Sequence, residues 1–351
     1  MRVAIDCRKL ADFGIGTYIR GLIGELARIG GGEEYIAVVP SRAVHLVPEP
    51  MRPLIVDAPN YRLRELWVVA RAIERAGADV FHAPHINIPL TDRPTIATLH
   101  DVIPLHVLPR WRPEYWYASL MTNRAARKSA VVLTVSEASK RALVETIGCP
   151  AEKIVVTPNG VEEIFFDPGP RNESYGDYVL YAGNDKPHKN LRGVLAAFEL
   201  LRRDRPSLQL VVAGVNVRSL RGRAGVHLTG FVSLDELMAL YRGARVALLP
   251  SFEEGFGLPA LEAMAAGTPA VVSATPALLE VTGDAALHVD PSSPEDIAAG
   301  VDRILCDAAL DEDLRRRGPM QARKFTWRRC AEMTRRVYED VYRSARSGTR
   351  W

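Results

Sequence analysis

The stretch RVALLPSFEEGFGLPALEAMAAGTPAVVS, residues 245–273, contains the pattern that decides the fold. Its two ends, 245–250 and 269–273, are short apolar runs of the kind found in buried strands. Between them Pro259 opens a good helical sequence, because proline is favoured at the first position of a helix. The stretch therefore predicts a strand, a glycine-rich loop, a helix and a second strand, which together form one unit of a parallel α/β sheet.

The same alternation continues along the rest of the chain. Further strand-like runs lie at 2–6, 35–40, 78–84, 94–101, 130–136, 153–161, 178–184, 208–214, 226–232 and 286–290. Helical patterns separate them, and the one at 136–148 opens with Ser136 as an N-cap and closes on Gly148. A chain of 351 residues is also long for a single core. We therefore expect an α/β protein with two Rossmann-like, doubly wound parallel-sheet domains that face each other across a cleft.

A polar segment rich in proline and glycine, FFDPGPRNESYGD at 165–177, marks the expected domain boundary. The chain then divides into an N-terminal domain, a linker, a second domain and a C-terminal segment, at 1–165, 166–177, 178–325 and 326–351. The C-terminal segment contains a long amphipathic helix at 327–347, in which Met333, Val337 and Val341 recur at helical spacing.

Composition narrows the classes of partner. The formal net charge is +3, and no dense stripe of Lys and Arg appears, so we expect no nucleic-acid binding. The four cysteines are far apart and form no metal-binding pattern, which favours a reducing compartment. The chain shows neither a signal peptide nor an apolar run of 18 residues. We therefore expect a cytoplasmic protein with at most peripheral contact with the inner face of a membrane.

The glycine-rich loop of the opening stretch is suited to an anionic ligand. Its backbone N–H groups point out of a helix N-terminus, where the helix dipole favours negative charge. Glu254 and Glu262 are eight residues apart, so on one helix they would be separated by about 12 Å and turned by roughly 80°. That separation excludes a shared proton and instead suits two carboxylates that accept from different hydroxyls of one ligand, such as a nucleotide sugar. The alternative is a solvated Glu254 and a Glu262 that only complements the helix dipole.

The run from Glu254 to Val272 resembles the Glu-x7-Glu signature of family-4 retaining glycosyltransferases, which have the GT-B fold. The resemblance implies that Glu254 contacts the donor sugar as a catalytic residue and that Glu262 binds the ribose hydroxyls. It also implies that backbone amides of the loop serve the sugar and the diphosphate, from Gly255, Phe256, Gly257 and Leu258.

A second stretch, YVLYAGNDKPHKNL at 178–191, resembles the donor-phosphate motif of the same family. In that motif an arginine follows the glycine and a lysine comes six residues after it. Gly183 and Lys189 occupy the glycine and lysine positions, and the resemblance gives Lys189 the diphosphate. Asn184 stands at the arginine position, so one phosphate contact is in doubt unless Lys186 or His188 replaces it. An exposed basic loop is the alternative.

Two loops of the N-terminal half carry further candidates. The loop with Gly14 and Gly16 is only a weak dinucleotide signal; the resemblance places it over the donor diphosphate, and a turn with positive φ is the alternative. His100 and Asp101 follow a predicted strand, where side chains face the expected cleft. The resemblance implies that His100 is a catalytic residue beside the donor sugar. Asp101, on the acceptor side, is expected to orient the His100 ring. A Ser/His/Asp hydrolase is disfavoured because no G-x-S-x-G elbow exists.

Other family-like landmarks have simpler interpretations. Ser136 and Glu137 are expected to cap a helix, and Asn159-Gly160 to form a turn. The segment 108–130 gathers several aromatic residues: Trp111, Tyr115, Trp116 and Tyr117. We expect these rings to pack on the sheet, with acceptor contact as the second interpretation and membrane contact as the third.

Together these patterns predict a retaining, metal-independent glycosyltransferase that uses a nucleotide-diphosphate sugar. No DxD motif lies at a plausible donor site, since the DED at 311–313 falls in a helical region, and we expect neither metal nor cofactor. Lys189 and helix amides would then stabilise the leaving diphosphate. The KPHKN form of the loop resembles that of family members that transfer mannose from GDP-mannose. UDP-glucose or a related UDP-sugar is the second candidate for the donor. The acceptor would be the hydroxyl of a glycan, a lipid-linked saccharide or a small molecule.

Two interpretations from other classes remain open. A non-catalytic, two-lobed sugar-binding protein would share paired Rossmann-like lobes. An activity on nucleotide sugars that is lost in Glu254→Ala would distinguish the enzyme from such a protein. An NAD(P)-dependent oxidoreductase would use Gly14 and Gly16, but the long interval after the strand at 2–6 disfavours it, and a lack of nicotinamide binding would dismiss it.

Overall fold

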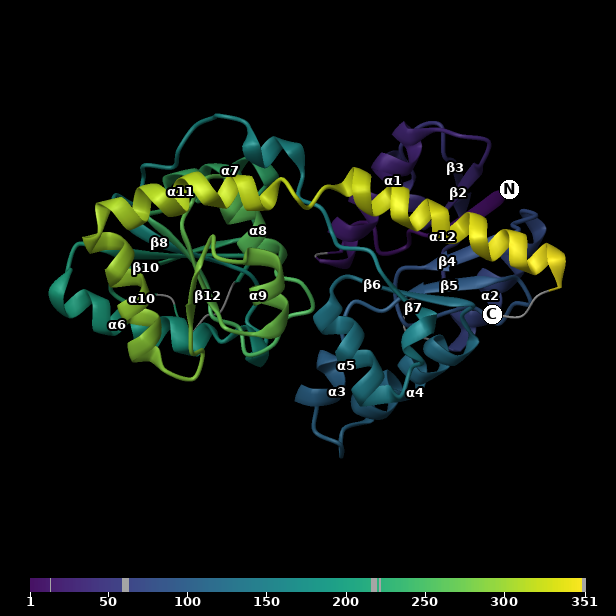
Figure 1. The fold of residues 1–351 in the computed structure, drawn as a ribbon, viewed down its shortest axis with the longest axis horizontal. Helices are drawn as coiled ribbons and strands as arrows, with labels where there is room; N and C mark the ends of the chain where they lie inside the picture. The colour runs from purple at the N-terminus through teal and green to yellow at the C-terminus, as the bar shows by residue number, and fades with distance from the viewer. Residues whose placement is uncertain (13, 59–62, 216–219, 221, 349–351) are drawn as a thin grey trace. The chain divides into compact units, whose positions relative to one another are not determined.

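The computed structural model describes residues 1–12, 14–58, 63–215, 220 and 222–348. The chain forms two compact units, one of residues 1–160 and 326–351 and the other of residues 161–325 (Figure 1). Each unit is a parallel sheet with helices around it, so the predicted pair of α/β domains is confirmed. No helix of the described ranges is both long and apolar enough to cross a membrane.

The first unit contains a seven-stranded parallel sheet of order β3-β2-β1-β4-β5-β6-β7. Its strands are β1 (Arg2–Asp6), β2 (Glu34–Val39), β3 (Arg52–Ile55), β4 (Val80–Ala83), β5 (Thr95–Thr98), β6 (Val131–Thr134) and β7 (Ile154–Val156). Its helices are α1 (Ile15–Ile29), α2 (Leu63–Arg75), α3 (Ile103–Val107), α4 (Pro113–Lys128), α5 (Glu137–Ile147) and α12 (Trp327–Ser347). Strands that are buried on both faces explain the continuous apolar runs of the sequence.

Apolar side chains from the sheet and from α2, α4 and α5 form one part of the core of this unit. Val69 of α2, Ala125 of α4 and Leu143 of α5 belong to one buried cluster with Phe81 of β4. Helix α12 comes from the end of the chain and packs against α1 (Figure 1). Its Tyr338 hydroxyl lies 2.6 Å from Nδ1 of the buried His82 on β4.

The strand β3 was absent from the sequence prediction. It is the edge strand of the sheet, it contains Pro53, and none of its residues is fully buried. Proline is tolerated at a sheet edge, and an exposed edge strand has no apolar run to reveal it.

The second unit contains a six-stranded parallel sheet of order β10-β9-β8-β11-β12-β13. Its strands are β8 (Tyr178–Ala182), β9 (Gln209–Ala213), β10 (Val226–Gly230), β11 (Val246–Leu249), β12 (Ala270–Ser273) and β13 (Leu287–Val289). Its helices are α6 (Leu191–Asp204), α7 (Leu234–Gly243), α8 (Leu258–Ala265), α9 (Pro276–Thr282), α10 (Pro294–Cys306) and α11 (Ala308–Ala322). Phe198 of α6, Val301 of α10 and Leu314 of α11 pack with Tyr181 of β8 in its core.

The boundary between the two units falls between Gly160 and Val161, whereas the sequence placed the end of the first domain at residue 165. Residues 166–177, expected as a linker, are grouped with the second unit. The backbone N–H of Asn172 donates to Ala239 O at 2.9 Å, and Arg242 Nη2 donates to Asp167 O at 2.8 Å. These hydrogen bonds attach the segment to α7.

Candidate active site in two parts

The strand order of the second unit changes direction between β8 and β11, and ligands of doubly wound sheets bind at the carboxyl ends of such strands. The loop after β8 leads to Lys189, and the loop after β11 leads to Glu254. The two loops are joined by a backbone hydrogen bond from Phe252 N to His188 O at 2.7 Å. The switch point therefore brings together the two motifs that the sequence singled out.

Lys189 and Glu254 form an ion pair at this switch point. Lys189 Nζ donates to Glu254 Oε1 at 2.7 Å and to Oε2 at 2.9 Å. Their side chains are only 16% and 6% exposed. Ser251 Oγ also donates to Glu254 Oε1, at 2.8 Å, and Ser273 Oγ donates to Ser251 O. The sequence had assigned Lys189 and Glu254 to separate parts of a donor and gave no sign of Ser251.

The glycine-rich loop ends at the first residue of α8. Gly257 has a φ of 99°, and a Cβ there would overlap the Leu278 side chain, so only glycine fits. Among the described residues no side chain caps α8, and its N-terminal amides point toward the loop. Phe256 is buried, with its ring centroid 5.6 Å from that of Phe325. Gly255, Gly257 and Leu258 thus lie where the sequence placed an anion-binding turn.

Glu262 is the fifth residue of α8, which begins at Leu258, so it lies just beyond the first turn of the helix. Its Oε2 accepts a hydrogen bond from the Tyr241 hydroxyl at 3.1 Å. Burial raises the pKa of Glu262 to about 7. This position weakens the alternative in which Glu262 only complements the helix dipole, since that effect is confined to the first turn.

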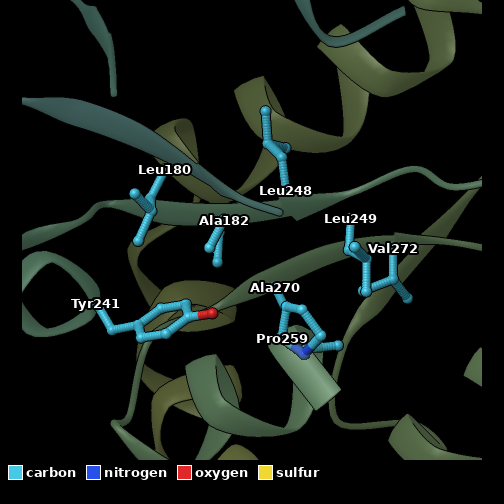
Figure 2. A pocket seen from close by; sticks show the side chains of 10 residues that line it. Leu180, Ala182, Tyr241, Leu248, Leu249, Pro259, Ala270 and Val272 are labelled. Atoms are coloured by element: carbon cyan, nitrogen blue, oxygen red, sulfur yellow. The ribbon is translucent and has the colours of Figure 1, made fainter. Parts of the chain in front are cut away.

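An apolar pocket lies beneath α8, between the helix and the strands β8, β11 and β12 (Figure 2). Figure 2 shows the Tyr241 hydroxyl pointing toward its centre, near Ala270 and Pro259. Its volume of about 10 Å³ is what one water molecule needs. The pocket is therefore part of the packing under the site, and a sugar does not fit it.

Asn184, at the position where the family motif has arginine, organises the loop after β8. Its backbone carbonyl accepts from the Tyr181 hydroxyl at 2.6 Å, and its Oδ1 accepts from Lys186 N at 3.1 Å. Gly183 N donates to Ala213 O at 3.0 Å, which holds the loop against the end of β9. Burial, followed by the charge of Lys189, lowers the pKa of the neighbouring His188.

Asn190 is a site residue that the sequence analysis missed. It has a φ of 57°, which asparagine tolerates better than other non-glycine residues, and it is buried. Its Oδ1 accepts from Gly193 N at 3.1 Å as the N-cap of α6. Its Nδ2 donates to Pro250 O at 3.0 Å and to Pro291 O at 2.7 Å. Asn190, which directly follows Lys189, therefore connects the loop after β8 to the loop that carries Glu254.

In the first unit the glycine loop differs from the expectation. Helix α1 begins at Ile15, so Gly16 is helical and only Gly14, with a φ of 67°, precedes the helix. A Cβ on Gly16 would lie 2.8 Å from Leu10 O and 3.0 Å from Lys9 O. Gly16 thus allows close packing of helix and loop, and Gly14 is the position that needs positive φ.

His100 follows β5, as expected, and two groups hold its ring. Nε2 lies 3.2 Å from Pro84 O, which can only accept, so Nε2 carries the proton. The Tyr18 ring packs edge-on at 4.8 Å. Burial lowers the pKa of His100 to about 4, so the ring is neutral near pH 7 and Nδ1 is an acceptor. Asp101 was expected to orient His100, but its Oδ1 accepts from Ile103 N at 3.0 Å at the start of α3. The Pro84 carbonyl orients the His100 ring instead.

A buried polar network lies beside His100 at the carboxyl ends of β1 and β4. Arg8 donates to Asp6 Oδ2 at 2.6 Å and to Glu65 Oε2 at 2.9 Å. Asn87 N donates to His85 Nδ1 at 3.1 Å, so Nε2 of His85 carries the proton and donates to Asp6 Oδ2, also at 3.1 Å. Burial by itself would raise the pKa of Asp6, but Arg8 and His85 hold it below its ordinary range. No sequence motif had revealed this network.

The aromatic segment does not pack as expected. Tyr117 is half-buried and its hydroxyl donates to Asn87 Oδ1 at 3.0 Å, but Trp111 and Trp116 are 77% and 62% exposed. The prediction that these rings pack on the sheet is therefore wrong for both tryptophans. Helix spacing alone did not distinguish the two faces of α4, because aromatic residues occur on both.

The remaining landmarks are structural. Ser136 Oγ accepts from Ser139 N at 2.9 Å as the N-cap of α5, and Gly148 closes that helix with positive φ, as predicted. Asn159-Gly160 is not a turn: these two residues carry no turn geometry, and Gly160 passes directly against the backbone of Trp327. The described residues contain no cluster of three or more His, Cys, Asp or Glu that could hold a metal ion.

The two Rossmann-like sheets give the chain the GT-B fold, and the family models and relatives identify it as a glycosyltransferase. Residues 14–163 match the family described as Glycosyltransferase Family 4, and residues 162–321 match Glycosyl transferases group 1. The chain is 30% identical to O-antigen chain mannosyltransferase B of Escherichia coli, over 82% of this chain and 81% of that protein. The chain belongs to glycosyltransferase family 4.

A further relative and two solved structures are also similar to this chain. The chain is 30% identical to the MMP alpha-(1->4)-mannosyltransferase of Mycolicibacterium hassiacum, over 93% of this chain and 94% of that protein. Among solved structures, sucrose-phosphate synthase from Thermosynechococcus elongatus matches 98% of this chain and 100% of its own, with a TM-score of 0.81 and 19% identity. Anabaena HepE, solved in complex with UDP-glucose, matches 97% and 100% with a TM-score of 0.75 and 15% identity. These structures share the fold.

Proposed function

We propose that this glycosyltransferase transfers mannose from GDP-mannose, with retention of configuration and without a metal ion, to the hydroxyl of a glycan, lipid-linked or small-molecule acceptor. The observation that carries the proposal is the Lys189–Glu254 pair at the β8/β11 switch point. The mannosyltransferase names of the two relatives that are 30% identical support mannose as the sugar.

The pair provides one group for each end of a donor. Lys189 is a compact cation that suits a diphosphate, and the amides at the start of α8 add partial positive charge on the same side of the sheet. The Glu254 carboxylate keeps acceptor capacity beyond the bonds from Lys189 and Ser251, since two oxygens offer about four lone-pair positions. A sugar hydroxyl donates there while the phosphates draw Lys189 toward themselves.

In the first unit, the neutral His100 provides an acceptor at Nδ1 for another sugar hydroxyl. Glu262 accepts from the ribose hydroxyls when it is ionised. The leaving diphosphate assists deprotonation of the acceptor hydroxyl in a front-face transfer, as in the family that the sequence resembles.

Thermal-shift measurements with GDP, UDP, ADP and dTDP sugars test the donor. We expect GDP-mannose to raise the melting temperature most; a larger shift with UDP-glucose would favour the second candidate donor. The assignment of the donor site fails if no nucleotide sugar shifts the transition. Glu254→Gln should lose transfer activity while Glu253→Gln, its direct neighbour, should keep it.

The stereochemistry and the metal are tested separately. NMR of the first product formed should show the anomeric configuration of the donor, and inversion would contradict a retaining reaction. Activity should persist in EDTA, and a loss that Mg²⁺ or Mn²⁺ restores would contradict the metal-independent reaction.

A further inference from the structure

Three large apolar side chains of the first unit lie together in the sequence and are exposed. Trp111, Trp116 and Leu120 are 77%, 62% and 66% exposed. Single exposed apolar residues are common, but several within ten residues form a patch, and patches mark interaction sites.

The geometry of α4 places two of these residues, Trp116 and Leu120, on one face of the helix. Trp116, Leu120 and Arg127 are separated by four and then seven residues, so they lie within about 40° of one another around the helix axis. Trp111 comes two residues before the first residue of α4. The exposed face of α4 is therefore a stripe of two apolar residues that continues into a cation.

Two arginines lie against rings of this segment. Arg112 Cζ lies 5.3 Å from the centroid of the Trp111 ring, and Arg110 Cζ lies 6.0 Å from that of Tyr115, which packs edge-on against Trp116. From residue 104 to residue 128 the exposed charged side chains are Arg110, Arg112, Glu114, Arg127 and Lys128. Four of these five charges are positive.

The opposite face of α4 is fixed to the body of the unit. Met121 and Ala125 are buried, and Arg124 Nη1 donates to Ile88 O at 2.6 Å. The Tyr117 hydroxyl donates to Asn87, which in turn donates to Glu65 of α2. The stripe is thus held in place by polar and apolar contacts on its inner side.

We propose that the aromatic–arginine surface formed by Arg110, Trp111, Arg112, Trp116, Leu120 and Arg127 docks on a lipid bilayer that carries anionic head groups. Tryptophan rings favour the head-group region, where one end of the ring is apolar and the other polar. Arginines beside them attract anionic lipids, and an apolar stripe with a basic margin is typical of helices that lie in the interface plane. The proposal does not depend on which sugar is transferred.

Flotation of the full chain with lipid vesicles tests the surface. Wild type should float with vesicles of phosphatidylcholine mixed with phosphatidylglycerol and much less with phosphatidylcholine alone. Trp111→Ala/Trp116→Ala should lower the partition coefficient at least about tenfold, because it removes the apolar contact. Arg110→Gln/Arg112→Gln should lower it about fivefold per charge on anionic vesicles only, and remove most of its dependence on salt.

A matched control carries one apolar and one basic change in the second unit, Met320→Ala/Arg203→Gln, both at exposed positions. It should float like wild type. Circular dichroism and thermal unfolding of each variant separate lost docking from lost folding, and transfer to a soluble acceptor should be unchanged in both surface variants.

Three results would overturn the proposal. One is a wild type that does not float with anionic vesicles. Another is a control variant that loses as much binding as the tryptophan variant. The third is a dimer, seen by light scattering, that the tryptophan variant dissociates while its flotation stays the same, since the surface would then be an interface between copies.

Discussion

At the scale of single residues, the ion pair of Lys189 and Glu254 changes how either residue can be tested. Both side chains are nearly buried, so removal of one charge leaves the other without its partner. Lys189→Met should lower the free energy of unfolding by about 2–4 kcal/mol, as well as weaken diphosphate binding. Urea denaturation measures the first effect and titration with GDP the second.

The double variant Lys189→Met/Glu254→Gln separates the two effects. It should recover most of the lost stability, because no uncompensated charge remains, but none of the GDP affinity. If the double variant is as unstable as the sum of its single changes, the pair contributes no coupling and its description as a mutually dependent unit is wrong.

Glu262 predicts a dependence of binding on pH. Burial raises its pKa to about 7, above its value of about 4.3 in an unfolded chain, so the folded state holds the extra proton between these two values. Its contribution to stability is therefore largest below pH 4 and is lost as the pH rises through 7. Nucleotide affinity should change in the opposite direction, since the ionised form accepts ribose hydroxyls, and should increase from pH 6 to pH 8.

If the ionised form of Glu262 binds the ribose, nucleotide binding near pH 7 should release a proton from Glu262. Calorimetric titration in buffers of different ionisation enthalpy measures this release directly. Glu262→Gln should bind weakly at every pH and should release no proton on binding. A wild-type affinity that is constant from pH 6 to pH 8 would exclude an ionising Glu262 from the ribose site.

The sequence predicted where Lys189 and Glu254 lie in the fold better than it predicted their contacts. Lys189 and Glu254 lie in the loops after the adjacent strands β8 and β11, as their positions after predicted strands required, whereas Glu262 lies within α8. The hydrogen bond from Ser251 to Glu254 spans only three residues, but no sequence motif marks it. Those from Asn190 to Pro250 and Pro291 were not predictable, because 60 and 101 residues separate the partners. The Asp6–Arg8–Glu65 network was not predicted for the same reason, since 57 residues separate Arg8 from Glu65.

At the scale of elements, the start of α6 depends on Asn190. One side chain caps the helix, bonds two carbonyl oxygens and stands in a left-handed conformation. Asn190→Ala should lower the free energy of unfolding by about 2–4 kcal/mol, from the lost cap together with two buried carbonyls left unpaired. Asn190→Gly should lose somewhat less, since glycine accepts the positive φ.

Donor kinetics test whether this element positions Lys189. Both variants should raise KM for the nucleotide sugar more than they lower kcat, when measured below the unfolding temperature of each variant. An unchanged KM in a destabilised Asn190→Ala would restrict the residue to a structural role.

Elements with continuous apolar runs were predictable, and those with mixed patterns were not. Helix α12 begins and ends as predicted, and the buried strands lie within the predicted runs except β2, which begins one residue earlier, at Glu34. The exposed edge strand β3 and the outer face of α4 were missed or misassigned, since exposure depends on tertiary neighbours that a local pattern does not contain. Gly16 was assigned to a loop but lies in α1, because glycine is a poor helix former and did not indicate a helix there.

At the scale of the whole molecule, the chain passes between its two units twice, at 160–161 and at 325–326. The two passing segments are hydrogen-bonded, from Val161 N to Phe325 O at 3.1 Å. After the second passage α12 joins the first unit, where Tyr338 and the neutral, buried His82 hold it to β4. The first unit is therefore complete only when the last segment of the chain has been added.

Gly160 is a point at which this arrangement is sensitive to a small change. A Cβ there would overlap the backbone of Trp327, where α12 begins, and backbone atoms cannot move aside as a flexible side chain can. Gly160→Ala should lower the free energy of unfolding by about 1–3 kcal/mol through overpacking. It should also increase proteolysis within α12. Gly24→Ala is the matched control: it lies in α1 with open space around its Cβ and should be neutral or stabilising by about 0.5–1 kcal/mol. Equal stability of the two variants would show that the crossing of the two segments has room to spare.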